Sequence, residues 1–407
     1  MRYKAFSTTA AGISHTKHGK GCEDFSLHYP PDGDVSAAPL AFAVVADGHG
    51  DDNCFRSAKG AEFAAAATKD AVVEFADRTK QWPPNDVFEK YIHDLVKHII
   101  AEWHGKVEKD YTGNPVTAEE LARAGEKYRK RYAAGEDLHH AYGTTLIAAA
   151  VTGQYWFGIH IGDGRFTALY PDGTFAQPVP WDERCFLNET TSICDDDAFD
   201  RARICHAPVS EKPPAAVFLC SDGVDDNYPV EENEKHLYRL YRTIALTFAD
   251  EGFDSTCGQL KDLANSFAVK GKGDDTSIAG IIDLEAVRNI APLLRQQAEE
   301  DEKKAAAEKA AKTEAARPEA AKTAAEEAAK AEETRAAAES EKTSPVIENA
   351  RAAIAAYEKQ KKPPNSPDPK GYGEFATAAG DVKVETAVRE KAPGLLAWVW
   401  RSLFPGN

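Results

Sequence analysis

Short apolar runs alternate with clusters of glycine, aspartate and proline over the first 283 residues of the chain. Runs of this kind, bounded by turn residues, predict β-strands. The pattern places strands at residues 40–45, 144–151, 155–161, 166–170, 216–220 and 276–282. Longer stretches with helical character predict helices at residues 57–77, 86–109, 117–134 and 255–269, the third opening with the capping pattern of Thr117 and Glu120.

Two connections between the predicted strands are very short. Residues 152–154 and 162–164 leave room only for tight turns, so we expect a hairpin at each and antiparallel pairing of the strands that they join. This argues against a doubly wound parallel sheet of the Rossmann kind. Strands separated by blocks of helix predict an α+β fold in which helices cover the sheets.

The composition changes after the predicted globular domain, which we place at residues 1–284. Residues 285–394 read as a linker that is rich in Ala, Glu and Lys and contains prolines. Its part at residues 299–342 is of low complexity and can be helical, or coiled-coil-like, without an apolar face to bury. Pro318 is expected to interrupt any single helix there, and residues 361–370 hold four prolines and are expected to be extended.

A short apolar segment, residues 395–407, closes the chain. It is too apolar to be left in water and too short to span a bilayer. Docking on the chain's own globular domain, insertion as a short helix into a groove of a partner protein, and shallow binding to a membrane surface all remain open. Because only Lys391 and Arg401 offer positive charge nearby, a protein contact is favoured over a membrane.

The charge and cysteine content narrow the functional classes. A net charge of −17 argues against a nucleic-acid partner and suits the binding of divalent cations. The seven cysteines are odd in number and form no CxxC pair, so neither a disulfide framework nor a thiolate zinc site is indicated. The N-terminus has no long apolar stretch of the kind found in signal peptides. We therefore expect a cytoplasmic protein.

Aspartates recur at the ends of the predicted strands. Asp47, Asp163 and Asp222 follow strands and are next to glycines, which let a backbone turn sharply or approach a ligand closely, and Asp274 comes just before the last strand. Each Asp-Gly alone is most simply a turn. Together these carboxylates predict a pocket with oxygen ligands, which favours Mg²⁺ or Mn²⁺ over Zn²⁺.

The order of the motifs resembles that of a known family. Asp-Gly-His at 47–49, Gly-Asp-Gly-Arg at 162–165, Ser-Asp-Gly at 221–223 and Gly-Asp-Asp-Thr-Ser at 273–277 resemble the motif series of the PPM (type 2C) metal-dependent Ser/Thr protein phosphatases, of the bacterial kind. The resemblance covers about residues 4–283. It implies an antiparallel β-sandwich flanked by helices on both sides, in α-β-β-α layers. It also implies hydrolysis of phosphoserine and phosphothreonine on proteins.

The resemblance also implies roles for individual residues. Asp47 would bridge two Mn²⁺ or Mg²⁺ ions that activate water for in-line attack on phosphorus, and His49 would be the general acid for the leaving oxygen. The other implied metal-binding residues are Gly48 through its carbonyl, Asp222 and Asp274 as further ligands, Glu23 or Asp24 through metal-bound waters, and Asp163 and Asp226 at a third, weaker metal site. A cysteine-based phosphatase mechanism is excluded because no cysteine has an arginine six residues on.

The group that grips the phosphate is not evident from the motifs. The family often carries an arginine shortly before the acidic pair, and residues 14–22 contain none. Lys17 and Lys20 are candidates that lack the bidentate fork of arginine. Arg56 is another candidate, weighed against a plain surface residue at a helix end. The acidic residues 188–200 are either a flap over the site or a solvated loop.

Two other functions remain open at this point. A binding or regulatory module that keeps the fold but has weak or no catalysis is favoured by the missing arginine. The retention of Asp47, His49, Asp222 and Asp274 argues against it. A structural adaptor would act mainly through residues 395–407.

Overall fold

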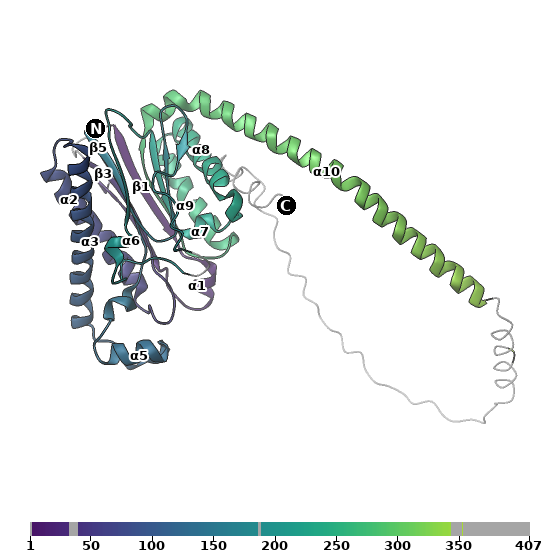
Figure 1. Cartoon of the computed structure of the whole chain (residues 1–407), viewed down its shortest axis with the longest axis horizontal. Coiled ribbons are helices and arrows are strands. Elements are labelled where there is room, and N and C mark those ends of the chain that lie inside the picture. The colour runs from purple at the N-terminus through teal and green to yellow at the C-terminus, as the bar shows by residue number, and fades with distance from the viewer. Residues whose placement is uncertain (1, 32–39, 186–188, 343–351, 353–407) are drawn as a thin grey trace, which may run out of the picture. The chain divides into compact units, whose positions relative to one another are not determined.

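Two five-stranded antiparallel sheets form the centre of the computed structural model (Figure 1), which describes residues 2–31, 40–185, 189–342 and 352. One sheet has the strand order β1 (Tyr3–Ala10), β10 (Thr276–Asp283), β9 (Ala216–Cys220), β6 (Arg165–Leu169), β7 (Phe175–Ala176). The other has the order β2 (Asp24–Tyr29), β3 (Leu40–Asp47), β4 (Leu146–Thr152), β5 (Tyr155–Ile161), β8 (Arg203–Pro208). We name them the β1 sheet and the β3 sheet.

The central strands are buried on both faces. In β3, Ala43 and Val45 face the β1 sheet and share a core with Val217 and Ile281, whereas Phe42 and Val44 face the opposite way. Two-sided burial explains why these strands are apolar throughout and could be predicted from their sequence.

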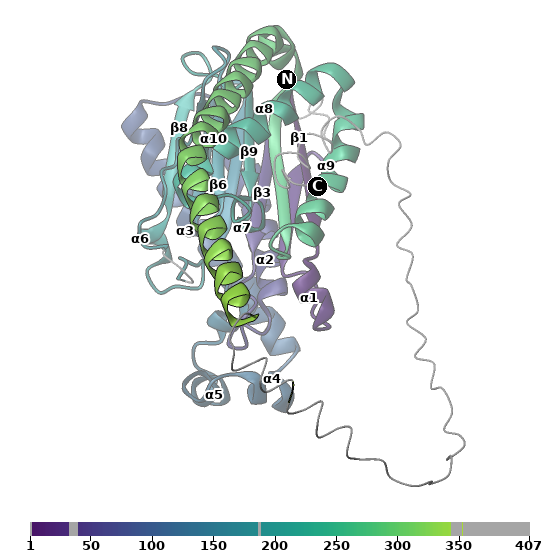
Figure 2. The same ribbon diagram turned by 90° about the vertical axis from the view of Figure 1, so that its right-hand side faces the viewer.

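Helices cover the outer face of each sheet (Figures 1 and 2). α2 (Ser57–Arg78) and α3 (Asn85–Gly113) cover the β3 sheet, and α8 (Asn233–Glu251), α9 (Phe253–Lys270) and the start of α10 (Leu284–Lys342) cover the β1 sheet. The order of layers is therefore helix, sheet, sheet, helix, which confirms the predicted fold class. The remaining helices are short: α1 (Ile13–Lys17), α4 (Ala118–Arg123), α5 (Glu126–Ala133), α6 (Ala198–Arg201), α7 (Asp222–Asp225) and the 3₁₀ helices η1 (Leu138–Tyr142) and η2 (Val230–Glu232).

One of the two predicted hairpins is wrong. Residues 152–154 do join paired strands, β4 and β5. Residues 162–164 instead carry the chain from β5 in the β3 sheet to β6 in the β1 sheet, and these two strands do not pair. Gly162 has φ +114°, and a Cβ there would lie 2.5 Å from the Cβ of Thr145, so glycine permits the sharp crossing.

The helix predicted at 117–134 is two helices, α4 and α5. The capping box is confirmed: the Glu120 N–H donates to Thr117 Oγ1 over 3.1 Å and the Thr117 N–H donates to Glu120 Oε2 over 2.8 Å. The break falls at Gly125, whose N–H donates to the Oδ1 of Asn53. This tertiary hydrogen bond therefore interrupts the helix at a point where local propensity favours its continuation.

The last described helix, α10, begins inside the globular part. Val287 and Leu294 are fully buried in the core between the β1 sheet and its helices, so this part extends past residue 284. Pro318, which was expected to interrupt a helix, lies within α10, where strong helix formers on both sides offset the single hydrogen bond that proline removes. Residues 361–370 and 395–407 lie outside the described residues.

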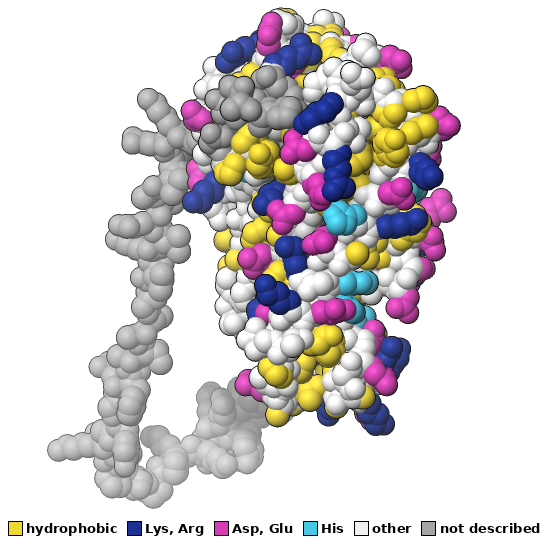
Figure 3. Space-filling view, turned by 90° about the vertical axis from the view of Figure 1, so that its left-hand side faces the viewer, with side chains coloured by type: hydrophobic (Ala, Val, Ile, Leu, Met, Phe, Trp, Pro, Cys, Tyr) yellow, Lys and Arg dark blue, Asp and Glu magenta, His cyan; other side chains and the backbone are white. Residues whose placement is uncertain are grey.

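None of the described helices combines the length and apolar character required to cross a membrane. On the face covered by α2 and α3, basic and acidic side chains are interspersed (Figure 3). Lys59 pairs with Asp110 on this face, and Lys106 pairs with Asp70.

Arg56 ties the α4 region to the start of α2. It is 8% exposed, and its guanidinium donates to both carboxylate oxygens of Glu120, over 2.8 and 3.0 Å. It also donates to the hydroxyl of Tyr142 and to the carbonyl of Asn114. The side chain therefore serves packing between distant segments.

Removing the buried guanidinium of Arg56 should destabilise the fold. Arg56→Ala leaves Glu120 and Tyr142 without their donor, so we expect a loss of about 2–4 kcal/mol in the free energy of unfolding. Urea unfolding followed by circular dichroism measures this. Arg78→Ala is the matched control, because Arg78 pairs with Glu74 while its side chain is 77% exposed, and it should change stability by less than about 0.5 kcal/mol. Equal losses in the two variants would contradict the structural role of Arg56.

Candidate functional site

The predicted aspartates meet at one end of the sandwich, where a cleft of about 830 Å³ opens. Antiparallel register brings them there: Asp24 at the start of β2 is directly opposite Asp47 at the end of β3. The predicted site residues that line the cleft are Asp47, Gly48, His49, Asp163, Asp222, Asp226 and Asp274. Four separate segments of the chain therefore supply these residues.

The end of β3 is fixed by its neighbour β4. The Asp47 N–H donates to the hydroxyl of Thr145 over 3.0 Å, and the Asp47 carbonyl accepts from the Thr145 N–H and the Thr144 hydroxyl, each over 2.8 Å. The Asp47 and Asp222 carboxyl groups lie close enough that each changes the pKa of the other. The backbone is rigid here, and the carboxyl group points to the other strand ends.

The acidic pair Glu23 and Asp24 lies behind Asp47. Asp24 is 6% exposed and accepts a hydrogen bond from the hydroxyl of Ser221 over 2.7 Å. Glu23 Oε1 accepts from the hydroxyl of Ser57, whereas its Oε2 is buried and has no hydrogen-bond partner among the described residues. A buried carboxylate oxygen without a donor indicates that something else is meant to satisfy it.

Asp222 and Asp274 reach the cleft from neighbouring segments of the β1 sheet. Asp222 begins α7 directly after β9, and Asp274 precedes β10. A Cβ on Gly223 would lie 1.9 Å from the carbonyl oxygen of Asp275, so only glycine lets α7 approach the start of β10 this closely. The Ser-Asp-Gly motif therefore has a packing reason for its glycine.

Burial makes the charged form of these acids unfavourable. It raises the pKa of Asp24 to about 7 and the pKa of Asp47 and of Asp222 well above the ordinary value, and the negative charges of neighbouring aspartates add to both of the latter shifts. Burial also raises the pKa of Glu23, Asp163 and Asp226. At neutral pH such a group of carboxyls holds protons unless cations replace them.

The donor set fits divalent cations. Among the described residues, no three or more His, Cys, Asp or Glu side chains form a ready-made ion site. Glu23 Oε2, which has no hydrogen-bond partner among the described residues, and the neighbouring carboxyl groups of Asp47 and Asp222 are positions that a hard cation would satisfy. The residues placed to hold ions are Asp47, the Gly48 carbonyl, Asp222 and Asp274, with Glu23 and Asp24 behind them and Asp163 and Asp226 at the side.

His49 lies in the turn after Asp47. Its N–H donates to the carbonyl of Gly143, and its ring is packed so closely against Gly143 that a Cβ there would lie 2.6 Å from the ring. Burial lowers the pKa of His49 to about 4. The ring is therefore neutral at pH 7 unless negative charge, such as that of a phosphate, is added to the cleft.

The three predicted phosphate-binding residues are placed very differently. The structure does not bring Arg56 to the cleft, since its guanidinium is held by Glu120, Tyr142 and Asn114. Lys17 is exposed on α1. Lys20 lies at the rim, where its Nζ donates to the carbonyl of Gly50, a cleft residue, over 2.7 Å.

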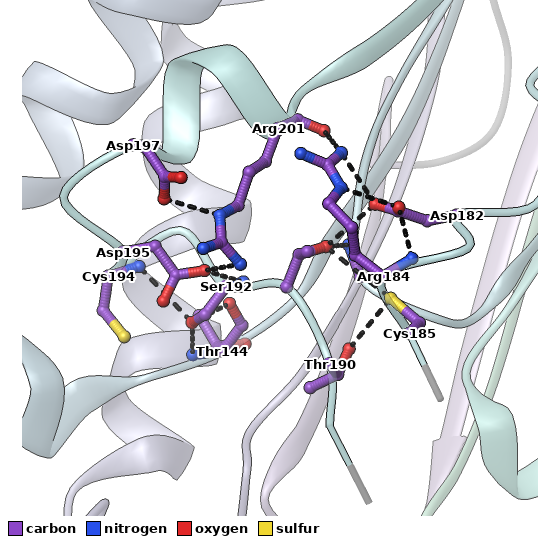
Figure 4. Close-up of polar contacts among 12 residues, drawn as sticks. Thr144, Asp182, Arg184, Cys185, Thr190, Ser192, Cys194, Asp195, Asp197 and Arg201 are labelled. Carbon is purple, nitrogen blue, oxygen red and sulfur yellow. Dashed lines mark hydrogen bonds and ion pairs between the residues drawn. The ribbon is translucent and has the colours of Figure 1, made fainter. Parts of the chain in front are cut away.

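The described part of the predicted acidic segment forms a flap that lines the cleft through Thr190, Ser192 and Asp195. Figure 4 shows its polar contacts. The hydroxyl of Ser192 donates to the carbonyl of Thr144 and accepts from the Thr144 N–H, and the Ile193 N–H donates to the same carbonyl. Ile193 is fully buried. The segment is therefore anchored beside the end of β3, and its residue 188 lies outside the described residues.

Two arginines of this region line the cleft, and the sequence patterns did not predict them as site residues. Arg184 donates to both carboxylate oxygens of Asp182, and Arg201 pairs with Asp195 and Asp197 (Figure 4). His15 and His140 also line the cleft. No local pattern marks these four residues, because tertiary contacts alone bring them to the aspartates.

Comparison with known proteins identifies the family. A model of the family described as protein phosphatase 2C matches residues 11–263. No curated protein matches the chain by sequence.

Three solved structures illustrate what the chain is similar to. Serine/threonine phosphatase Stp1 from Staphylococcus aureus is 14% identical with a TM-score of 0.42, covering 69% of this chain and 95% of that chain. The catalytic domain of serine/threonine protein phosphatase PstP, in complex with two manganese ions, is 16% identical with a TM-score of 0.40, covering 69% and 97%. PppA from Pseudomonas aeruginosa is 16% identical with a TM-score of 0.40, covering 69% and 98%.

The family assignment rests on the family model. That model covers more than half of the chain and includes Asp47, Asp163 and Asp222. The chain belongs to the protein phosphatase 2C family.

Proposed function

We propose that the chain is a metal-dependent phosphatase that hydrolyses phosphoserine and phosphothreonine on proteins. One observation carries the proposal: Asp47, Asp222 and Asp274, from three different strand ends, meet in a single open cleft. Family membership supports the class of reaction. The convergence of these carboxyl groups supports a cation-dependent chemistry, because acids at such a density are otherwise destabilising.

The residues would divide the work as follows. Two Mn²⁺ or Mg²⁺ ions, when bound, supply Lewis-acid activation of water and offset the negative charge of the phosphoryl group. Asp47, the Gly48 carbonyl, Asp222 and Asp274 would hold them, with Asp163 and Asp226 at a third, weaker position. His49 would donate a proton to the leaving seryl or threonyl oxygen, its ring kept in place by Gly143.

A non-catalytic binding module is the second candidate. The position of Arg56 favours it, because this arginine is committed to Glu120 and no other arginine replaces the one expected before the acidic pair. A cleft with cations but a weak phosphate grip would bind phosphoprotein without efficient turnover. The assay below separates the two functions.

Loss of a bridging or terminal carboxylate should abolish turnover. We expect the full chain with Mn²⁺ or Mg²⁺ to hydrolyse p-nitrophenyl phosphate and a phosphothreonine peptide, and EDTA to stop it. Asp47→Asn and Asp222→Asn should each lower kcat/KM by about 100-fold or more, since each removes charge that stabilises the transition state. Asp262→Asn, an exposed position on α9, is the control and should retain activity. A folded chain that binds metal and hydrolyses neither substrate would support the binding module instead.

Without divalent ions the stability should fall as the pH rises. The pKa of Asp24 is about 7 in the folded chain and about 4 in an unfolded one, so the folded state binds more protons between these values and loses stability as they dissociate. In EDTA we therefore expect a lower Tm at pH 8 than at pH 5, and added Mn²⁺ should restore most of the difference. Differential scanning calorimetry measures this. The Tm of Asp24→Asn should depend less on pH than that of the unmodified chain. An equal dependence in the two proteins would contradict the raised pKa of Asp24.

A further inference from the structure

His15 lines the cleft beside the carboxylates, and its role is not covered by the proposed mechanism. It belongs to α1, a helix of five residues. The N–H of Ser14 donates to the carbonyl of Gly273 over 2.9 Å, and the hydroxyl of Ser14 donates to the same carbonyl. These bonds fasten α1 to the loop that carries Asp274, so the imidazole stays at this edge of the cleft.

Asp275 fixes the orientation of the ring. Its Oδ2 lies 2.9 Å from the Nδ1 of His15. The same carboxylate, on a residue only 3% exposed, accepts the backbone N–H of Gly12 and the backbone N–H of Glu23, each over 2.6 Å. Because two backbone groups hold the carboxylate, it presents a fixed partner to Nδ1 of the ring.

The contact between Asp275 and Nδ1 also determines which nitrogen of the neutral ring carries the proton and which has a lone pair. An ionised carboxylate only accepts hydrogen bonds, so the proton of a neutral His15 is on Nδ1. Nε2 of the neutral ring then has a lone pair and no hydrogen. It can bind a cation, and it cannot donate a hydrogen bond to a phosphate oxygen.

The position of Nε2 suits a shared ion. It lies 3.6 Å from Oδ1 of Asp274, which is too far for a hydrogen bond. Ligands lie about 2.0–2.2 Å from a bound divalent ion, so two neighbouring ligands of one ion are about 3–3.6 Å apart. A histidine that gives one ring N–H to a carboxylate and turns the other nitrogen to a metal is a frequent arrangement in metal sites.

We propose that His15 is a nitrogen ligand of the metal centre, binding through Nε2 the same ion that Asp274 holds, and that Asp275 is its positioning residue. The inference rests on the cation site of the proposed function. It changes the predicted all-oxygen donor set to a mixed one. Since imidazole suits transition-metal ions better than Mg²⁺, His15 disfavours Mg²⁺ at this position.

The test detects the nitrogen directly. Mn²⁺ alone is added to the full chain at pH 7.5, without phosphate, and electron spin-echo envelope modulation is recorded. We expect modulation from a coordinated ¹⁴N nucleus, replaced by the ¹⁵N pattern in protein with ¹⁵N-labelled histidine, a measurement that needs no variant. In His15→Gln the modulation should vanish and the Kd for Mn²⁺ should rise about 10-fold or more. The Kd for Mg²⁺, measured by competition, should change less.

His18→Gln is the matched control. His18 is exposed, directly follows α1, and its Nδ1 contacts the carbonyl of Ser14 over 2.7 Å, so both the modulation and the affinity should be kept. Absence of nitrogen modulation in the unmodified chain, or its persistence in His15→Gln, would overturn the inference. A His15→Gln chain that binds Mn²⁺ normally but binds inorganic phosphate more weakly would also overturn it, by showing that the ring serves the phosphate.

The same samples separate this inference from the proposed function. Turnover of the phosphothreonine peptide without nitrogen modulation would overturn the ligand role of His15 and leave the phosphatase standing. Nitrogen modulation without turnover would confirm the ligand and overturn the phosphatase.

Discussion

Repulsion among buried carboxylates is the constraint on which the rest of this structure depends. Burial makes it costly to ionise Asp24, Asp47 and Asp222, and the negative charges of neighbouring aspartates raise the pKa of Asp47 further. Such a cluster persists only if the surrounding fold is stable enough to hold it. The two-sided burial of the central strands provides that stability, because three apolar cores lie between and outside the sheets.

Hydrogen bonds to neighbouring hydroxyl groups and to one carboxylate hold the cluster in place. Ser221 donates to Asp24, Thr144 and Thr145 fix the backbone of Asp47, and Asp275 holds the backbone of Glu23. None of these contacts brings a cation to the acids. The carboxyl groups are thus preorganised for an ion. In the proposed function, they would not have to rearrange when it binds. Thr144 also anchors the flap, because its carbonyl accepts a hydrogen bond from the hydroxyl of Ser192.

Local patterns predicted the parts of this arrangement that are locally determined. The central strands were found because both of their faces are apolar, and Asp47, Asp163 and Asp222 because each follows such a strand next to glycine. β1, β2 and β8 were missed because polar residues interrupt them. The turn at 162–164 was misread because two strands close in sequence can lie in different sheets. Arg56 and His15 depend on partners 64 and 260 residues away, which no local pattern records.

The charge around the cleft determines how a phosphate is held. Arg184 and Arg201 line it, yet each is already paired with aspartate, and Lys20 at the rim donates to the Gly50 carbonyl. Arg56 is committed elsewhere. In the part of the chain that the structure describes, the cations of the cleft are thus largely neutralised by its acids. In the proposed function, a phosphate dianion would be repelled by the metal-free cleft, so bound divalent ions would supply substrate binding as well as activation of water. Affinity for substrate should then depend on metal occupancy, whereas a phosphatase with an arginine grip would keep part of its affinity without metal.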